Sequence, residues 1–342
     1  MIIFSRPIVI AHLCVSAIIP LIPSTASAAA DYATRPEVQS FITEMHEKHG
    51  FNRAMLNDAF ARIKPLPMVI RAVRPPRDPT IRSWQVYRAR NVEAQRIALG
   101  LRFWHEHQEA LARYSAQSGV PEEIIVAIIG IETIYGRTVG RFGAFAALTT
   151  LAFDYPDDIP ETAPARAALF RHELEELLLL ARETKRNLLS IRGSYAGALG
   201  LPQFLPSSVR LYGVDGDNDG NIDLDNSPED AIASVANFLQ QHGWQRNGRI
   251  AANARADGEK IADLLKLDIV PKLTPTEMSA YGVSSPDAPN IPAALIDLVT
   301  PQQATEYRLG FNNFYVLTRY NRSSFYALAV NDLAETLSRA YR

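Results

Sequence analysis

A single glutamate, Glu132, stands near the end of the otherwise apolar segment GVPEEIIVAIIGIETIYG, at residues 119–136. Burial disfavours the charged form of a carboxyl group, so a glutamate in such surroundings keeps its proton to a higher pH than usual. A carboxyl group that titrates near neutral pH suits a general acid. The alternative is an ordinary glutamate near a helix C-terminus, whose carboxylate reaches solvent or a neighbouring cation.

A glycine-rich segment, GSYAGALGLPQFLPSS, occupies residues 193–208. Its glycines at positions 193, 197 and 200 permit tight turns and the close approach of a ligand to the backbone. Ser194 and Gln203 offer short polar side chains among these small residues. The segment is therefore a candidate ligand-binding loop, and the alternative is a loop–helix junction whose glycines serve packing.

An acidic loop places Asp215, Asp217 and Asp219 at positions 1, 3 and 5 of an EF-hand pattern. A glycine follows at position 6, and Asn221 offers its carbonyl at position 7. Position 12 is Asn226 rather than the usual bidentate glutamate. The spacing favours a structural Ca²⁺, and the alternative is an aspartate-rich turn without metal. A calcium sensor is disfavoured, because sensors usually pair two such loops.

Apolar spacing predicts a mainly helical chain. The predicted helices cover residues 35–61, 83–114, 121–136, 144–153, 165–186, 228–242 and 324–341. Proline-containing loops are expected at residues 65–67, 75–79 and 157–164. From about residue 243 the texture changes, and β-prone runs at residues 294–299 and 314–320 predict a small β-rich subdomain. The expected fold class is therefore mainly α, with an α+β organisation.

Composition narrows the possible function classes. The chain has 342 residues, is 47% hydrophobic and carries a net charge of −2 without a basic block, which disfavours nucleic-acid binding. Its seven histidines form no paired metal-binding motif, so a catalytic zinc is not expected.

The N-terminal residues 1–28 have the features of a secretory signal. Arg6 supplies the positive charge, an apolar stretch covers residues 8–22, and the small residues ASA end at position 28. The alternative is an uncleaved anchor, although the apolar stretch is short for a membrane span. Cys14, the single cysteine, lies in this segment without the small preceding residue of a lipidation site, so lipid anchoring is not expected. Export of a mature chain without cysteines indicates a protein of the bacterial periplasm or cell envelope, and the periplasm is the expected location.

Longer motifs follow one another along the chain. They read IGIETIYG, ALTTLAFDYP, GSYAGALGLPQFLPSS, DAIASVANFLQQHGW and GFNNFYVLTRYNRSSFYALAV. From about Tyr87 to Val330 the chain resembles the lytic murein transglycosylase B family, which is glycoside hydrolase family 103 of the lysozyme-like superfamily. The resemblance implies a lysozyme-like core with a helical flank and a small β-rich subdomain.

These expectations divide the chain into three parts. The signal peptide covers residues 1–28, and the catalytic region covers residues 29–242 together with 311–342. The catalytic region includes the EF-hand-like loop at residues 215–230, and the β-rich subdomain covers residues 243–310.

The resemblance implies an enzyme, a carbon–oxygen lyase that cleaves the MurNAc-β-1,4-GlcNAc bond of peptidoglycan and leaves 1,6-anhydromuramoyl ends. Glu132 would be the single acid and base, with the N-acetyl group of the substrate stabilising C1, so catalysis would need no cofactor. The expected partner is the glycan strand, bound by a monomer, and protein partners in cell-wall synthesis or remodelling stay unassigned. The alternatives are a hydrolytic muramidase on the same scaffold and a non-catalytic peptidoglycan-binding protein.

The resemblance also carries site roles to single positions. It implies sugar contacts or cleft-lining roles for Tyr87, Ser194, Gln203, Phe238, Tyr320, Asn321 and Tyr326. Phe238 stands where the family can carry a tyrosine, so a hydroxyl contact is missing there. Asp230 resembles the closing ligand of an elongated calcium loop. For each aromatic residue the alternative is packing in the core or at the rim of the cleft.

One departure from the family lies after the sequence FDYP. The family often continues with two arginines and an aromatic residue, whereas Asp157 and Asp158 follow here. Arg166 and Leu169, further along, are the candidate equivalents, so one arginine and the aromatic ring are absent. Binding of the peptide stem or of a distal sugar is the property that this departure affects.

Overall fold

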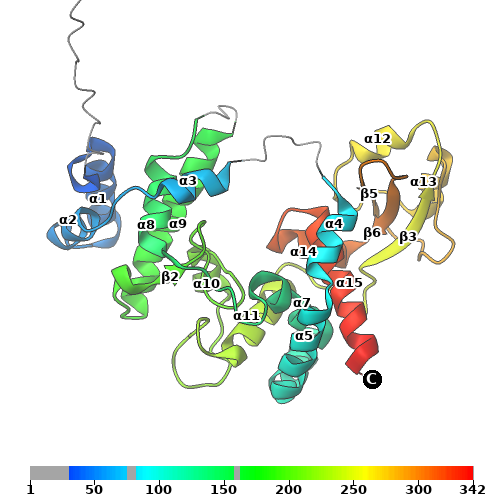
Figure 1. Ribbon diagram of the computed structural model, residues 1–342, viewed down its shortest axis with the longest axis horizontal. Coiled ribbons are helices and arrows are strands. Elements are labelled where there is room, and N and C mark those ends of the chain that lie inside the picture. Colours follow the sequence, from blue (N-terminus) through cyan, green and yellow to red (C-terminus); the bar gives the residue numbers. More distant parts are fainter. Residues whose placement is uncertain (1–30, 75–81, 158–161, 342) are drawn as a thin grey trace, which may run out of the picture. The chain divides into compact units, whose positions relative to one another are not determined.

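The computed structural model describes residues 31–74, 82–157 and 162–341. Three predicted features lie outside these ranges: the signal segment at residues 1–28, the loop at residues 75–79, and Asp158. Helices dominate the described residues, which confirms the prediction of a mainly α protein (Figure 1). Among the described residues no helix combines the length and the apolar character that crossing a bilayer requires.

The helix predicted over residues 35–61 is interrupted. A short 3₁₀ helix, η1 (Tyr32–Thr34), precedes helices α1 (Pro36–His49) and α2 (Arg53–Ala61). Gly50 ends α1 with a left-handed φ of 70°, and the side chain of Asn52 accepts the N–H of Met55 to begin α2. Both helices bury an apolar face, so the spacing of apolar residues continues from α1 into α2. The sequence pattern therefore did not reveal the break.

The helix predicted over residues 83–114 is likewise divided. It contains α4 (Trp84–Asn91), α5 (Ala94–Glu106) and α6 (Gln108–Ser118). Helix α3 (Pro67–Val73), which comes before it, was not predicted. The carboxylate of Glu93 caps α5 by accepting the backbone N–H groups of its first turn. His107 separates α5 from α6.

Helix α7 (Glu122–Thr133) is the central helix of the main core. Residues 124–130 are all buried, because α5, α6, α11 and α15 pack around it (Figure 1). Pro121 is its N-cap, and Glu122 and Glu123 in the first turn complement the positive end of the helix dipole.

Except for α10, which was not predicted, the helices that follow agree with the predicted ones to within a few residues at their ends. They are α8 (Ala144–Phe153), α9 (Ala163–Glu183), α10 (Pro206–Tyr212), α11 (Pro228–Gln241) and α15 (Ser324–Tyr341), with a 3₁₀ turn, η2 (Leu188–Ser190), after α9. Helix α9 packs on α8 and buries most of its leucine stripe, although Leu169 is 41% exposed.

Two antiparallel sheets are present in the described residues. Strands β1 (Phe142–Gly143) and β2 (Arg192–Gly193) form a small one. The larger has the order β4-β3-β6-β5 and contains β3 (Ala251–Ala256), β4 (Val283–Ser284), β5 (Ala294–Leu298) and β6 (Glu306–Gly310). Helices α12 (Ile261–Leu265) and α13 (Pro275–Met278) and the turn η3 (Ser279–Tyr281) accompany it, and a separate hydrophobic cluster forms around Leu264, Leu295 and Leu309.

One predicted element is wrong. The β-prone run at residues 314–320 lies in helix α14 (Asn312–Tyr320). Its aromatic and branched residues suggested a strand, but Phe314 and Leu317 lie on one buried helical face. The buried Asn313 fixes the first turn, since its side chain accepts the N–H of Gln245 at 2.8 Å and donates to the carbonyl of the same residue at 2.8 Å. Tertiary contacts therefore override the local propensity.

Candidate active site

Glu132 is the penultimate residue of α7, and an unusual turn follows it. Ile134, Tyr135 and Gly136 all have left-handed backbone angles, with φ of 51°, 55° and 87°. A β-branched residue such as Ile134 rarely adopts this conformation, so the surrounding structure must hold it there. Strain of this kind concentrates at functional sites, which makes the end of α7 a candidate.

Thr133 supplies part of the restraint on this turn. Its buried hydroxyl donates to the carbonyl of Leu201 at 2.9 Å and accepts the N–H of Gly136 at 3.1 Å. The first bond joins the end of α7 to the glycine-rich segment that contains Ser194 and Gln203. Glu132 is thereby fixed against that segment.

The carboxyl group of Glu132 is half-buried, and desolvation raises its pKa to about 7. The buried hydroxyl of Tyr326 donates to Oε1 at 2.6 Å and acts in the opposite direction, because this hydrogen bond favours the carboxylate. Near neutral pH the group therefore exists in both protonation states. It can release a proton in one step and accept one in the next.

Two further tyrosines belong to the same site. The ring of Tyr320 lies nearly parallel to that of Tyr326, with centroids 6.2 Å apart, and its hydroxyl donates to the carbonyl of Pro202 at 2.6 Å. The pKa of Tyr87, Tyr320 and Tyr326 is raised, first by burial and then by the negative charge of Glu132. The charge of Glu132 thus acts on all three phenols, and the hydrogen bond of Tyr326 and its ring pair with Tyr320 give the geometry of the site.

Phe238 lies behind this group rather than in the open. It is buried on α11, with its ring centroid 4.9 Å from that of Tyr320 and 5.5 Å from that of Phe204. Its ring supports Tyr320 from the core side.

Ser194 and Gln203 line a hollow of about 420 Å³ together with residues 137–142. The amide of Gln203 donates to the carbonyls of Gly200 at 2.9 Å and Val139 at 3.3 Å. The hydroxyl of Ser194 accepts the N–H groups of two later residues in its own turn. Both side chains are thus held by their loops while they face the hollow.

The glycines near this hollow make room for protein atoms. A Cβ on Gly200, whose φ is 66°, would lie 2.3 Å from the carbonyl oxygen of Leu224. A Cβ on Gly140, whose φ is 93°, would lie 2.3 Å from the carbonyl oxygen of Gly193. At these positions the close approach is between two backbones, as in the packing alternative for this segment.

Two predicted site residues have exposed side chains. Asn321 is exposed at the end of α14, and Arg166 is exposed on α9. Among the described residues no hydrogen bond or ring contact joins either side chain to Glu132 or its tyrosines.

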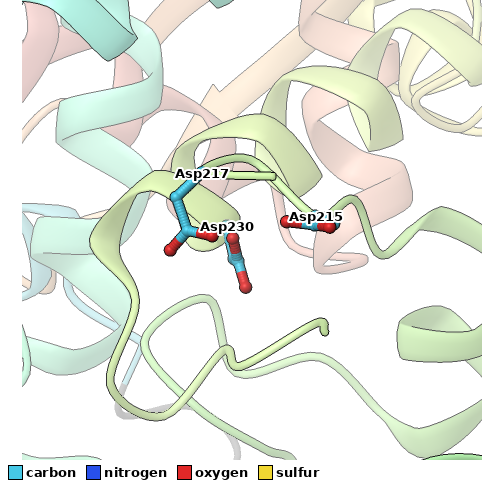
Figure 2. Close-up of side chains that lie close together, drawn as sticks. All are labelled: Asp215, Asp217 and Asp230. Atoms are coloured by element: carbon cyan, nitrogen blue, oxygen red, sulfur yellow. The ribbon is translucent and has the colours of Figure 1, made fainter. Parts of the chain in front are cut away.

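The acidic loop brings three carboxylates together. Asp215, Asp217 and Asp230 each place one oxygen within 4.8 Å of the others, from the loop and the first turn of α11 (Figure 2). Calcium takes oxygen ligands at about 2.3–2.6 Å, so this spread fits one such ion. Asp219 instead accepts the backbone N–H of Asn221 at 2.8 Å, and the two residues add no carboxylate to the cluster.

The buried Asp230 fixes this loop. Its two oxygens accept the N–H of Gly216 at 2.8 Å and the N–H of Asp223 at 2.6 Å. The predicted closing residue therefore joins the start of α11 to the beginning and the middle of the loop.

Sequence reasoning missed Arg96, which is buried on α5 and donates through Nε to the carbonyl of Gly130 at 3.0 Å. A cation near the C-terminal end of α7 complements the helix dipole. It also missed Tyr135, whose ring packs against Gly130 and Gly100. The two glycines, at facing positions of α5 and α7, were the available signal, whereas nothing distinguishes Arg96 from a surface arginine in sequence.

Comparison with known proteins gives consistent results. Residues 33–335 match the family described as Transglycosylase SLT domain. The chain is 37% identical over 321 residues to the membrane-bound lytic murein transglycosylase B of Escherichia coli K12, covering 91% of this chain and 85% of the relative.

Solved structures agree with this match. Soluble lytic transglycosylase SltB1 of Pseudomonas aeruginosa superposes with a TM-score of 0.80 at 40% identity, covering 89% of this chain and 99% of that one. Lytic transglycosylase Slt35 of Escherichia coli, solved in complex with calcium, superposes with a TM-score of 0.79 at 36% identity, covering 91% and 95%. The resemblance seen in the motifs and the lysozyme-like fold are confirmed, and the chain belongs to the Transglycosylase SLT domain family.

Proposed function

We propose that this protein is a lytic murein transglycosylase that cleaves the MurNAc-β-1,4-GlcNAc bond of peptidoglycan, with Glu132 as its single acid and base. The observation that supports Glu132 as the acid and base is the raised pKa of its carboxyl group. A pKa of about 7, set by burial and moderated by the hydroxyl of Tyr326, makes both protonation states available at neutral pH.

The reaction needs no second carboxylate. Protonated Glu132 gives its proton to the glycosidic oxygen as the bond from that oxygen to C1 breaks, and the N-acetyl group of the substrate stabilises C1. The C6 hydroxyl then bonds to C1 and returns its proton to Glu132. No water is added, the product is a 1,6-anhydromuramoyl end, and the enzyme recovers its starting state. Substrate-assisted reactions of this kind differ from the usual two-carboxylate glycosidases.

The residues around Glu132 divide into three roles in this proposal. Tyr326 positions the carboxyl group, while Tyr87 and Tyr320 supply ring surface against which a sugar packs. Ser194 and Gln203 line the adjoining hollow and contact the sugar backbone. Phe238 acts through Tyr320, and the exposed Asn321 and Arg166 are contacts for outlying parts of a long strand.

Product analysis tests this function. Purified sacculi are digested, and the released muropeptides are weighed by mass spectrometry. Anhydro ends, about one water lighter than hydrolysis products, are expected, and Glu132→Gln should lower the rate by at least about 10²–10⁴-fold while preserving the fold. Release of reducing MurNAc alone would favour the hydrolytic muramidase. Tight binding without release by the wild-type protein would favour the non-catalytic alternative.

The acidic loop is proposed to hold a structural calcium ion. The three carboxylate oxygens within 4.8 Å support this, as does the calcium complex of the Escherichia coli relative. Asp215, Asp217 and Asp230 would bind the ion, with Asp219 and Asn221 completing the loop. A bound cation would stabilise the connection between the glycine-rich segment and α11, and it takes no part in the proton transfers.

Location and domain division are proposed from the sequence. Residues 1–28 act as a cleavable signal, so the mature enzyme works in the periplasm, where its substrate lies. Residues 29–242 with 311–342 form the catalytic region, and residues 243–310 form the β-rich subdomain. Cell fractionation with N-terminal sequencing tests the first point, since the mature chain should begin at Ala29.

A further inference from the structure

The hollow that contains Ser194 and Gln203 is positively charged. Arg137 and Arg141 both line it, both are exposed, and its lining includes no aspartate or glutamate. Among the described residues neither guanidinium has a hydrogen bond, an ion pair or a ring contact. The exposed Tyr195 lies at the same hollow. Two free guanidinium groups therefore face one concave surface.

Other arginines of this chain are neutralised by neighbouring acids. Arg210, for comparison, forms ion pairs with both Glu176 and Glu183. The whole chain carries a net charge of −2, so the pair at the hollow is a local reversal of sign. Guanidinium groups bind carboxylates through paired N–H donors, and a concave surface of one sign concentrates ligands of the other.

The hollow lies next to the catalytic carboxyl group without including it. The loop that carries both arginines is tied to the end of α7, because the N–H of Thr138 donates to the carbonyl of Thr133 at 2.9 Å. The other wall, around Gln203, is tied to the tyrosines by the bond from Tyr320 to Pro202. A substrate whose glycosidic bond lies at Glu132 can therefore extend a side group into this hollow.

We infer that Arg137 and Arg141 bind carboxylates of the peptide stems that peptidoglycan carries on MurNAc. The inference rests on the proposed function. GlcNAc is neutral, and in intact peptidoglycan the lactyl group of MurNAc is taken up in an amide bond, so the stems carry the carboxylates of the substrate. In stem-free glycan the lactyl group itself becomes a carboxylate, which is a second source of the same chemistry.

The test compares stem-carrying glycan strands with the same strands after an amidase has removed the stems. The double variant Arg137→Gln with Arg141→Gln should lower kcat/KM on stem-carrying strands by about tenfold, through KM rather than kcat. On stem-free strands its kcat/KM should change less than twofold. The matched control is Arg102→Gln, which removes an exposed arginine from α5 and should leave both substrates unaffected.

Each other outcome overturns the inference. Equal losses on both substrates would assign the arginines to the sugar backbone or to the lactyl carboxylate, and no loss on either would leave them without a binding role. A stem-dependent loss in Arg166→Gln instead of the pair would place stem binding on α9. Failure of the wild-type enzyme to form anhydro ends from either substrate would contradict the proposed function and is a separate result.

A binding measurement makes the test independent of turnover. In a Glu132→Gln background, calorimetry should show weaker binding of a stem-carrying disaccharide after the arginines are replaced, with unchanged binding of the stem-free one. Replacement of both arginines by lysine should restore part of the affinity, because the charge remains while the paired donors are lost. Circular dichroism melting checks that each variant is folded.

Discussion

Glu132 and the acidic loop at residues 215–230 use carboxyl groups in opposite ways. Glu132 stands alone, half-buried, with one hydroxyl donor from Tyr326. In the loop, Asp215 accepts two backbone N–H groups and Asp230 accepts two more, so several acids share a dense set of donors. Desolvation with a single donor gives a group that exchanges protons, whereas many fixed donors give oxygens held in place for a cation.

The difference teaches that the number of acids in a segment does not identify the acid best suited to proton transfer. The loop is the most conspicuous acidic feature of the sequence, yet its carboxylates point toward one another and to backbone N–H groups. The single glutamate has the perturbed pKa and the strained turn beside it. Each of the following predictions tests one side of this contrast.

The largest expected effect on stability concerns the ionisation of Glu132. Its pKa of about 7 in the folded protein is higher than its ordinary value, so the folded state binds the proton more tightly than the unfolded chain does. Stability is therefore lost as the pH rises from about 4.5 to 7. One pKa unit corresponds to about 1.4 kcal/mol, so the loss at pH 8 is on the order of 3 kcal/mol at most.

Glu132→Gln removes this ionisation and should melt at a higher temperature than the wild type at pH 8. At pH 5 the advantage should shrink to below about 1 kcal/mol, because the carboxyl group is still protonated in the folded state and pH 5 lies only about half a unit above its pKa of 4.5 in the unfolded chain. Thermal melting at the two pH values measures the difference. Glu109→Gln removes an exposed carboxylate and should show no such pH dependence; an identical pH dependence in both variants would contradict desolvation at Glu132.

Calcium binding at the acidic loop should give the next largest effect on stability. An ion that binds the folded state alone stabilises it by about 2.7 kcal/mol at a hundredfold excess over Kd. Addition of Ca²⁺ to metal-stripped protein should therefore raise the melting temperature, and EDTA should reverse the rise. A bound ion would relieve the repulsion among Asp215, Asp217 and Asp230.

The variant Asp215→Asn with Asp217→Asn sharpens this test. Asparagine keeps one side-chain oxygen, which can still accept the N–H of Asp219 at both positions, while the bond from the N–H of Gly220 to the second oxygen of Asp215 and two charges are lost. In this variant the rise in melting temperature on addition of Ca²⁺ should be only a small fraction of the wild-type rise. Asp287→Ala, which removes an exposed acid from the β-rich part of the chain, should keep the full rise. An equal response in all three proteins would rule out this loop as the binding site.

Much of the fold was predictable from local patterns, and the failures have physical causes. Helix α8 was placed correctly to both ends, because its apolar run is bounded by Gly143 and Asp154. The run at residues 314–320 misled, since the side-chain bonds of Asn313 that begin α14 reach residues far away in sequence.

The site was predictable only in part for the same reason. Glu132 stood out through its apolar segment, but its hydrogen bond from Tyr326 spans 194 positions of sequence. The motifs suggested both residues, while nothing local indicated that they touch. The arginine pair could not be predicted as a binding site from the sequence, because the fold brings residues 137–142 and Gln203 to opposite sides of one hollow.

Tyr326→Phe should change the pH profile of the enzyme. The hydroxyl donates to the carboxyl group of Glu132 and lowers its pKa, so removal of the hydroxyl raises that pKa further above 7. The alkaline limb of the kcat/KM profile should move upward by about one pH unit, which corresponds to roughly 1.4 kcal/mol. Phe325→Leu, a neighbouring change without a donor, should leave the limb in place. A downward shift in Tyr326→Phe would show that the bond favours the protonated form.

The smallest effect concerns a polar group that the active-site region leaves unpaired. In the described part of the chain the buried hydroxyl of Tyr135 has no hydrogen-bond partner, in contrast to the satisfied oxygens of the acidic loop. Burial of an unpaired hydroxyl costs free energy, so Tyr135→Phe should stabilise the protein by about 1 kcal/mol and keep activity within about twofold. Chemical denaturation with a sugar-cleavage assay measures both.

The same ring also shows how closely α5 and α7 approach. A Cβ on Gly130 would lie 2.3 Å from the hydroxyl of Tyr135, so Gly130→Ala should destabilise the protein although alanine normally favours a helix. In the double variant with Tyr135→Phe the nearest atom is gone, and part of the loss should be recovered, which a double-mutant cycle reports as a favourable coupling. If the two substitutions have strictly additive effects on stability, the ring of Tyr135 moves aside freely. The packing of this ring would then not help to hold the left-handed turn after Glu132, and the bonds of Thr133 would be its remaining restraint.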